Sequence, residues 1–380
     1  MIIELHILQN FAPSCLNRDD TNSPKECQFG GYRRARISSQ CIKRSIRESF
    51  KENLLIPQDT LASRTKKLMD ILVTRLEEKG KQRDKAIIAA VNALKSMGFS
   101  INDNETQYLI FIGNKEAEKI ADIILKHWDK FLSMGETEKQ KSKKKESAES
   151  LPEAISKELK DAMDGGKAVD LALFGRMIAD LKEKCIDAAC QVAHAISTNK
   201  VGVEFDFYTA LDDLTKKADE SGAAMMGTVE FNSACYYRYA NINLDTLKSN
   251  LGGDYDLAKK SVEAFIRASV KAIPTGKQNS MAAQSPPSFI FAVVRNSGTW
   301  SLANAFIKPI YIGNDGDLIK QSINSLVEYW NKLTKAYGEN EIKAKPAVTL
   351  EDVKLDGLNK ANNLDLLIQE VMNAVSSLRK

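Results

Sequence analysis

The pattern of hydrophobic and polar positions along the chain predicts a mixture of strands and helices. Residues 2–8 are nearly all apolar or β-branched and predict a buried strand rather than a signal peptide. Helical periodicity marks the segments 38–50, 61–79, 83–97, 115–132, 257–272, 319–333 and 364–378. Strand patterns mark the segments 108–112, 169–174, 188–196, 229–239 and 288–294. Because strands and helices do not alternate regularly, this order favours an α+β fold over a doubly wound sheet.

Two segments interrupt the pattern. Residues 10–31 are polar and contain proline and asparagine, which predicts an irregular loop. Residues 135–150 mix lysines with glutamates and contain Ala148 as their one apolar residue. Such a charged stretch is typical of a mobile loop.

Composition narrows the class of protein. The chain has 380 residues, of which 43% are hydrophobic, and this is enough for a sizeable core. Its net charge of +4 is too small to indicate nucleic acid by itself. The six cysteines form no C-x-x-C pair, which argues against a zinc ribbon and favours reduced thiols. Since no stretch approaches the about 20 apolar residues of a membrane helix, we expect a cytoplasmic protein without a membrane partner.

A search for catalytic chemistry finds no convincing constellation. The histidines are His6, His127 and His194, and no two of them lie in H-x-x-x-H spacing. Cys190 precedes His194 by four residues, but one such pair falls short of the four ligands of a structural zinc. The adjacent carboxylates Asp212 and Asp213 are a pattern that is also common in loops. The sequence therefore predicts no catalytic site, no metal and no cofactor.

The strongest feature is the basic segment at residues 29–47. On a helix of about 3.6 residues per turn, Lys43 and Arg47 share one side with Gln40. Another side carries Ile42 and Ile46 and continues through Phe50 and, if the helix runs that far, Leu54. We expect the apolar stripe to anchor the helix and the basic stripe to face a polyanion or water.

The start of this helix is suited to phosphate. Ser38 and Ser39 lie where free amide groups and the positive end of the helix dipole favour an anion, and three arginines, Arg33, Arg34 and Arg36, come just before it. The simpler interpretation is a solvated basic face. Against it, Glu48 is the only acidic residue between positions 28 and 51, so most of these charges lack a partner nearby in sequence.

Several ordered motifs resemble one known family. They are Pro13-Ser14-Cys15-Leu16-Asn17-Arg18-Asp19-Asp20, Phe29-Gly30-Gly31, Arg33-Arg34-Ala35-Arg36-Ile37-Ser38-Ser39-Gln40, Gly175-Arg176-Met177, Gly227-Thr228-Val229-Glu230-Phe231-Asn232-Ser233 and Ser301-Leu302-Ala303-Asn304-Ala305-Phe306. The chain thereby resembles the CasC family, the backbone subunits of the type I-E CRISPR Cascade complex. The resemblance runs from the first strand to beyond residue 300, while residues 135–150 and the C-terminal stretch match poorly.

This resemblance implies a fold and a set of partners. The fold is an RRM-like (ferredoxin-like) palm at residues 1–55, 166–199 and 227–380, with a helical fingers insertion at 56–165 and a β-hairpin thumb at 200–226. The partners are CRISPR guide RNA, target DNA, further copies of the chain arranged head to tail, and the other Cascade subunits (large, small, 5′-handle-capping and guide-processing). In the family, each thumb kinks the RNA and flips out one base at regular intervals.

The resemblance also implies site residues. Those expected to contact RNA are Arg18, Arg33, Arg34, Arg36, Ser38, Ser39, Gln40, Lys43, Arg44, Arg47, Arg176, Met177, Phe207, Tyr208, Lys277 and Gln278. Met177 is expected either at the kink or in the core. Phe207 and Tyr208 either stack on bases or form the core of the hairpin. Five lysines of the charged stretch attract duplex DNA or form a solvated loop: Lys139, Lys141, Lys143, Lys144 and Lys145.

Two other functions stay open from the sequence. Distant backbone subunits of type III complexes cut target RNA with a thumb aspartate, and Asp206, Asp212 or Asp213 could take that role. The second alternative is a stand-alone RNA-binding module. Under this hypothesis the protein is a monomer that does not assemble head to tail.

Overall fold

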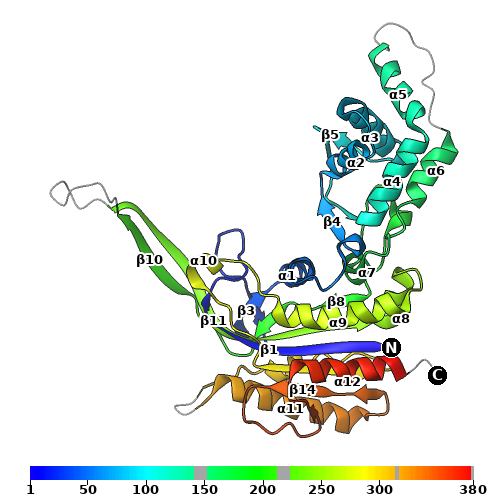
Figure 1. The fold of residues 1–380 in the computed structure, drawn as a ribbon. Coiled ribbons are helices and arrows are strands. Elements are labelled where there is room, and N and C mark those ends of the chain that lie inside the picture. Colours follow the sequence, from blue (N-terminus) through cyan, green and yellow to red (C-terminus); the bar gives the residue numbers. More distant parts are fainter. Residues whose placement is uncertain (141–151, 212–222, 313–315, 378–380) are drawn as a thin grey trace. The chain divides into compact units, whose positions relative to one another are not determined.

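The computed structural model describes residues 1–140, 152–211, 223–312 and 316–377, which form two compact units (Figure 1). The first unit contains Met1–Asn53, Gln191–Asn243 and Val262–Lys380, and the second contains Leu54–Cys190 and Leu244–Ser261. The predicted division differs at three places. It assigned residues 54–55, 166–190 and 244–261 to the palm, whereas the contacts group all three segments with the second unit.

The first unit is built on one large sheet. Its central strand β1 (Ile2–Ser14) lies between β11 (Ala223–Asn243) and β12 (Phe289–Arg295) and is antiparallel to both. The path continues beyond β12 through β14 (Pro346–Thr349) to β15 (Asn359–Lys360), and beyond β11 through β9 (Ala195–Ser197) and β3 (Tyr32–Ile37) to β2 (Glu26–Phe29). Off this path, β13 (Ile342–Ala344) joins β12, while β8 (Cys190–Val192) and β10 (Glu204–Leu211) join β11.

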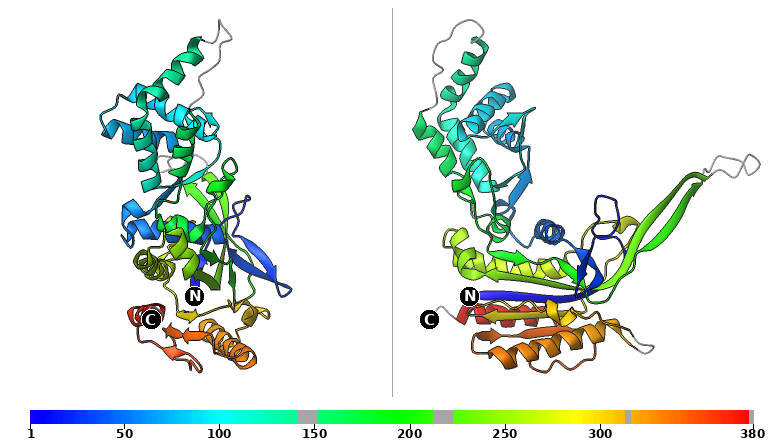
Figure 2. Two further views of the ribbon diagram at one scale, coloured as in Figure 1. Left: turned by 90° about the vertical axis from the view of Figure 1, so that its right-hand side faces the viewer. Right: turned by 180° about the vertical axis from the view of Figure 1, so that it is seen from behind.

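Helices cover both faces of this sheet (Figure 2). Alternate side chains of β1 point to opposite faces. Leu5 and Ile7 lie on the side of α1 (Ser39–Glu52) and α9 (Tyr255–Lys271). Leu8 belongs to the apolar core of the other side, which includes Trp330 of α11 (Leu318–Tyr337). The short α10 (Gln278–Met281) follows α9, and α12 (Leu364–Ser376) packs against β12 and β14.

The second unit is mainly helical. One apolar core joins α2 (Leu68–Glu78), α3 (Arg83–Met97), α4 (Asn114–Lys126), α5 (Trp128–Gln140) and α6 (Glu153–Asp161). Two small antiparallel sheets accompany the helices: β4 (Ala62–Thr65) with β7 (Ile110–Gly113), and β5 (Ile101–Asn102) with β6 (Glu105–Thr106). The helices α7 (Val169–Phe174) and α8 (Leu244–Asn250) also belong to this unit.

The mixed α+β class is confirmed, and so are most elements. Several predicted segments are nevertheless wrong. Residues 169–174 form the helix α7 rather than a strand, because Val169 to Leu173 are buried all round and a short apolar run does not distinguish the two. The predicted helix at 61–79 begins with the strand β4, and the helix at 115–132 is divided at His127, which ends α4.

The predicted loop at residues 10–31 is also partly regular. β1 extends to Ser14, and β2 pairs with β3 in a hairpin. The predicted strand at 188–196 is two short strands, β8 and β9. Among the described residues, no helix has the length and hydropathy that a membrane span requires.

Candidate nucleic-acid interface

Helix α1 forms as its sequence predicts. Ser38 is the N-cap, and its hydroxyl oxygen accepts a hydrogen bond from the Cys41 amide at 3.3 Å. Ile42, Ile46 and Phe50 are buried, which confirms the anchoring stripe. Leu54 does not extend it, because the helix ends at Glu52 and Leu54 is exposed in a left-handed conformation.

The other side of α1 presents the predicted polar residues. Gln40 and Arg44 are exposed, and Lys43 and Arg47 are half-buried. Arg44 forms an ion pair with Glu48 at 2.8 Å, one turn later on the same helix. Ser38 itself is buried, and its amide donates to the Asn17 side-chain oxygen at 2.8 Å, so it organises the helix start rather than offering a free hydroxyl.

The three arginines of β3 separate into different environments. The Arg33 side chain is 60% exposed and is paired with Glu26. Arg34 is wholly buried, and its guanidinium donates to four main-chain carbonyls, those of Ser197, Thr198, Phe306 and Ile307. The assignment of Arg34 to the RNA-contacting set is therefore corrected: this side chain holds the β3 strand to two distant segments of the first unit.

Arg36 is half-buried, between exposed Arg33 and buried Arg34, and it contacts His194. Its guanidinium contacts His194 Nδ1 at 3.1 Å, and the Ser39 amide donates to the same nitrogen at 3.4 Å. Partial burial and the positive charges of Arg36 and Lys25 lower the pKa of His194. The neutral imidazole thus acts as an acceptor at the start of α1, a role that the isolated histidine in the sequence did not indicate.

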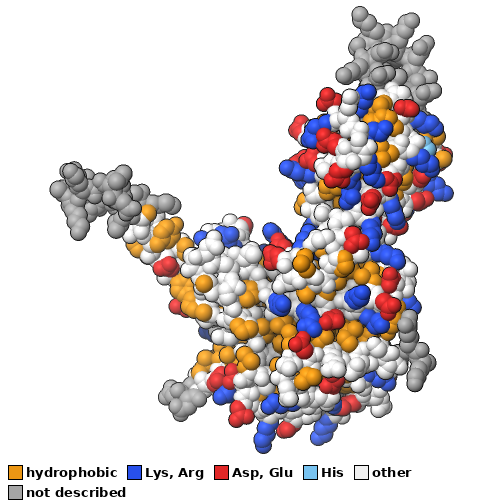
Figure 3. Space-filling view, viewed as in Figure 1, with side chains coloured by type: hydrophobic (Ala, Val, Ile, Leu, Met, Phe, Trp, Pro, Cys, Tyr) orange, Lys and Arg blue, Asp and Glu red, His pale blue; other side chains and the backbone are white. Residues whose placement is uncertain are grey.

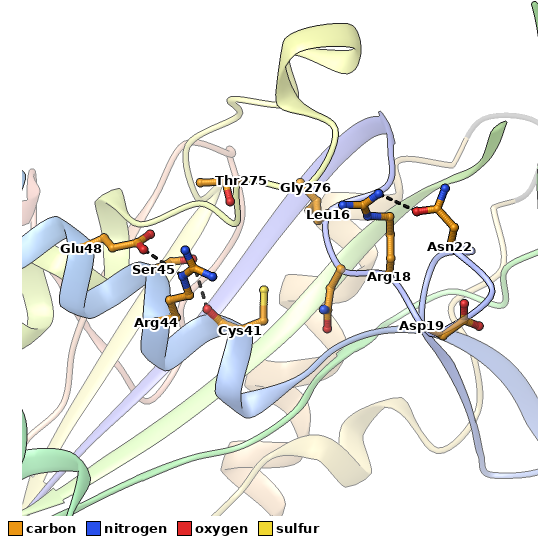
Figure 4. A pocket seen from close by; sticks show the side chains of 11 residues that line it. Leu16, Arg18, Asp19, Asn22, Cys41, Arg44, Ser45, Glu48, Thr275 and Gly276 are labelled. Atoms are coloured by element: carbon orange, nitrogen blue, oxygen red, sulfur yellow. Dashed lines mark hydrogen bonds and ion pairs between the residues drawn. The ribbon is translucent and has the colours of Figure 1, made fainter. Parts of the chain in front are cut away.

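A cavity of about 460 Å³ opens beside the start of α1 (Figure 4). It is bordered by the loop at residues 16–22, by α1 and by residues 275–276. Arg18 lines it and donates to the Asn22 side-chain oxygen at 2.5 Å, while Arg44 and Glu48 line it from the helix. The cavity thus joins cationic side chains from segments that are far apart in the sequence.

The loop after α9 lines this cavity with Thr275 and Gly276, and Lys277 follows them in the chain. Burial raises the pKa of the Cys15 thiol against the opposing influence of the Arg18 and Lys277 charges, so both cations lie near this thiol. Gln278 has a different role from the one predicted. Its side-chain amide donates to the carbonyls of Pro274 and Ala283 and thereby shapes the loop.

Gly276 sets how closely this loop approaches the Arg18 loop. A Cβ at this position would lie 2.4 Å from the Leu16 carbonyl oxygen and 2.6 Å from that of Cys15. Gly276→Ala is therefore expected to displace the Lys277 loop and to weaken RNA binding, at a stability cost of about 1–3 kcal/mol typical of overpacking. Titration of a labelled single-stranded RNA measures the binding.

Gly202→Ala is the matched control, since its Cβ would meet no atom within 4 Å. Equal RNA affinity of the Gly276→Ala and Gly202→Ala proteins would contradict a role for the Lys277 loop in binding.

The hairpin of β10 and β11 carries the predicted aromatic residues on opposite faces. Phe207 lies opposite Thr228 and is 65% exposed. Tyr208 lies opposite Gly227 and packs on it, since a Cβ on Gly227 would be 2.4 Å from the Tyr208 hydroxyl oxygen. Tyr208 thus has a partner within the hairpin.

Two residues that the sequence analysis missed share the face of Phe207. Phe205 is two positions earlier on β10, and Met226 lies opposite Thr209 on β11; both are exposed. Side chains directly opposite each other in an antiparallel pair lie on one face. Figure 3 shows hydrophobic side chains along this hairpin. The alternation of Phe205 with Phe207 is the sequence signal that could have found this apolar stripe.

In the second unit, the neighbouring side chains of Arg176 and Met177 differ completely in their exposure to solvent. Arg176 is buried and bonded to the Glu116 carboxylate at 2.8 Å, so its assignment as an RNA contact is also corrected. Met177 is 88% exposed, which is compatible with the predicted contact.

The remaining predicted residues are only partly described. Asp206 is exposed on β10, whereas Asp212 and Asp213 lie outside the described residues. Lys139 belongs to α5, and Lys141, Lys143, Lys144 and Lys145 also lie outside them. Within the described residues, no three histidine, cysteine or acidic side chains are grouped so that they could hold a metal ion.

Comparisons with known proteins cover nearly the whole chain. The family described as CT1975-like protein matches residues 3–374. A solved structure titled "CRISPR RNA-guided surveillance complex, pre-nicking" contains a chain that is 30% identical, with a TM-score of 0.86 over 98% of this chain and 100% of that one. Another, titled "CRISPR RNA-guided surveillance complex", is 25% identical with a TM-score of 0.75 over the same shares. No curated protein sequence matches.

Proposed function

The chain belongs to the CT1975-like protein family, and we propose that it is the repeating backbone subunit of a type I-E CRISPR Cascade surveillance complex. In this proposal it is not an enzyme. Copies polymerise head to tail along CRISPR guide RNA, bind the RNA backbone without sequence preference, and present the guide for pairing with target DNA in antiviral defence.

The observation that carries this proposal is the structural likeness. A chain of an RNA-guided surveillance complex matches 98% of these residues at 30% identity, with a TM-score of 0.86. Since the match includes both units, it supports a shared role in such a complex rather than a shared small module.

The fold supports the finer parts of the proposal. The antiparallel order β12-β1-β11-β9-β3 is compatible with an RRM-like palm. The β10–β11 hairpin has the form expected of a thumb, and the helical second unit has the form expected of fingers.

The site supports backbone recognition of RNA. Among the predicted residues whose side chains are exposed or half-buried, Gln278 is left out because its amide holds its own loop. We retain Arg18, Arg33, Arg36, Ser39, Gln40, Lys43, Arg44, Arg47, Met177, Phe207, Tyr208 and Lys277. Cations and neutral donors that contact phosphate and sugar position RNA without reading its sequence. A subunit that serves many guides requires this property.

The proposal is tested by purifying the chain after expression on its own. Particle mass and the ratio of nucleic-acid to protein absorbance are recorded before and after RNase treatment. We expect a polydisperse assembly that carries host RNA and falls apart with RNase. If the purified chain is a monomer without RNA, guide RNA and the partner subunits are added, and a failure to assemble then contradicts the proposal.

Changing Lys43 and Arg47 to alanine is expected to reduce the salt dependence of RNA binding. Each phosphate contact contributes about −0.7 to the slope of log K against log salt for single strands. With Arg18, Arg33, Lys43 and Arg47 on phosphates, the slope is expected to be about −2.8, and the double variant should lower its magnitude by about 1.4. Binding titrations over a range of salt concentrations measure the slope.

The control removes two charges from elsewhere on the first unit. Lys332 and Lys335 lie on α11, on the other face of the sheet from α1. Their replacement by alanine changes the net charge equally. If both double variants change the slope alike, net charge rather than the α1 surface explains the binding.

A further inference from the structure

Glu48 is a carboxylate in a surface that otherwise favours anions. It is the only acidic residue between positions 28 and 51, and it lines the cavity beside α1. Arg44 Nε donates to its Oε1 at 2.8 Å. Its second oxygen, Oε2, has no donor among the residues that the structure describes, and the side chain is 38% exposed. Because a carboxylate repels a phosphate, a surface that binds only phosphate has no use for this acceptor.

The two arginines of the cavity differ in the charge that they offer to a ligand. Arg18 donates to the neutral side chain of Asn22 at 2.5 Å, so its positive charge remains available to a phosphate. Arg44 is 75% exposed but paired with Glu48, and the pair carries no net charge. It still offers hydrogen bonds, since the other N–H groups of Arg44 donate and Glu48 Oε2 accepts. The cavity therefore has a cationic side at Arg18 and a neutral donor–acceptor side at the Arg44–Glu48 pair (Figure 4).

The other carboxylate that lines the cavity, Asp19, serves its own loop. Its Oδ1 accepts the Thr21 hydroxyl at 2.8 Å and the amides of Thr21 and Ser23 at 2.9 and 3.0 Å. These hydrogen bonds, first that of the Thr21 hydroxyl, hold the pKa of the Asp19 carboxyl below its usual range. We therefore assign the contact with a ligand to Glu48, which has a donor beside it in Arg44.

The chemistry of the RNA backbone matches this neutral side of the cavity. Phosphate oxygens accept hydrogen bonds, whereas the ribose 2′-hydroxyl both donates and accepts. Glu48 Oε2 is placed to accept from such a hydroxyl, and Arg44 is placed to donate to its oxygen. DNA has no hydroxyl at this position, so a DNA strand brings the Glu48 carboxylate no donor and meets only its repulsion.

We propose that Glu48 and Arg44 form a binding site for the ribose 2′-hydroxyl and thereby select RNA over single-stranded DNA. This inference rests on the proposed function, which brings an RNA backbone to the surface of α1. Both residues belong to the first unit, as do the other residues that line the cavity. Every ribonucleotide carries the hydroxyl, so the site distinguishes the type of strand without reading its sequence.

The test is a binding titration with three labelled single strands of one sequence composed of A, C and G. The strands carry ribose, deoxyribose or 2′-fluororibose, so they differ only at the 2′ position. The 2′-fluoro strand keeps the sugar conformation of RNA but lacks the hydroxyl donor. The chain is first freed of host RNA with RNase and purified again. We expect it to bind RNA about tenfold more tightly than either other strand, as a hydrogen bond to a charged group allows.

Variants of α1 then locate the preference. Glu48→Ala is expected to bind DNA more tightly and to lose most of the preference for RNA, because it removes the repulsion and releases the Arg44 charge. Glu48→Gln keeps an acceptor oxygen and should retain part of the preference. The matched control is Glu52→Ala, which removes the same charge from the same helix outside the cavity and should keep the preference. Circular dichroism checks that each variant folds.

The outcomes separate this inference from the proposed function. An unchanged preference in Glu48→Ala overturns the site, and so does an equal loss in Glu48→Ala and Glu52→Ala. A 2′-fluoro strand that binds the wild-type chain as tightly as RNA also overturns it, without any variant, and leaves the proposed function standing. If the chain binds no strand even with the partner subunits added, the proposed function itself is refuted.

Discussion

Replacing Arg34 with alanine is expected to destabilise the first unit severely, while the same change at Arg33 leaves it folded. Arg34 is wholly buried and satisfies the carbonyls of residues 197, 198, 306 and 307. Hydrogen bonds to a charged group contribute about 1.5–3 kcal/mol each, and unpaired buried carbonyls carry a desolvation penalty. Because the four bonds are not additive, we expect a loss of about 3–5 kcal/mol.

Arg33→Ala is the matched comparison, since the two arginines are adjacent. The Arg33 side chain is mostly exposed, and its ion pair with Glu26 is of the surface kind that contributes about 0–1 kcal/mol. Urea unfolding measures stability, and RNA titration measures affinity. Arg33→Ala should change affinity alone. If Arg34→Ala unfolds at the wild-type urea concentration, the buried carbonyl network does not stabilise the fold as argued.

The first unit is expected to lose stability as the pH falls below about 6.5, because of His6. Its side chain is fully buried on β1, with Nδ1 2.9 Å from the Tyr237 hydroxyl and the ring close to Tyr239 and Phe291. Burial, assisted by the positive charge of Arg295, lowers the pKa of His6 to about 3. Between these two pKa values the unfolded chain binds a proton that the folded chain does not.

The sign and size of the change in stability follow from this difference in pKa between the folded and unfolded chain. The contribution of neutral His6 is fully present above pH 6.5 and decreases by about 1.4 kcal/mol per pH unit below it, which amounts to about 3 kcal/mol by pH 4. Glu4 has the opposite effect on stability. Burial raises the pKa of its carboxyl, so protonation of Glu4 favours the folded state as the pH falls.

Urea unfolding at several pH values measures this dependence. His6→Phe keeps an aromatic ring but removes the titration, and it leaves Glu4 in place in both proteins. We expect the curve of stability against pH for His6→Phe to be flatter than that of the wild type between pH 6.5 and 4. Parallel curves would show that His6 does not take up the proton on unfolding.

Much of the fold could be predicted because its signals are local. The α3 helix occupies the predicted residues 83–97, and α1 begins after its predicted cap, Ser38. Both results depend on periodicity and capping within about one turn of helix. The α7 helix was mistaken for a strand because a fully buried element lacks a polar face to reveal its period.

The candidate site could be predicted only as a set of residues. Its cavity is assembled from residues 16–22, 41–48 and 275–276, and their approach depends on Gly276 packing against the Cys15 and Leu16 carbonyls. The spacing of these segments along the chain does not indicate that they meet. The resemblance to a known family, rather than periodicity, is what grouped them.

The α+β class, the amphipathic α1 helix and the concentration of cations before and along it can all be read from the residue pattern. Which of these cations face outward depends on the folded chain. Arg33 and Arg34 are neighbours of the same residue type, yet one is exposed and the other is bound to carbonyls that lie 163 to 273 residues further along the chain. Arg176 is buried in the same way, against Glu116. The physical reason is that a guanidinium can serve a phosphate or a cluster of buried carbonyls equally well, and the choice depends on long-range contacts that composition and spacing do not encode.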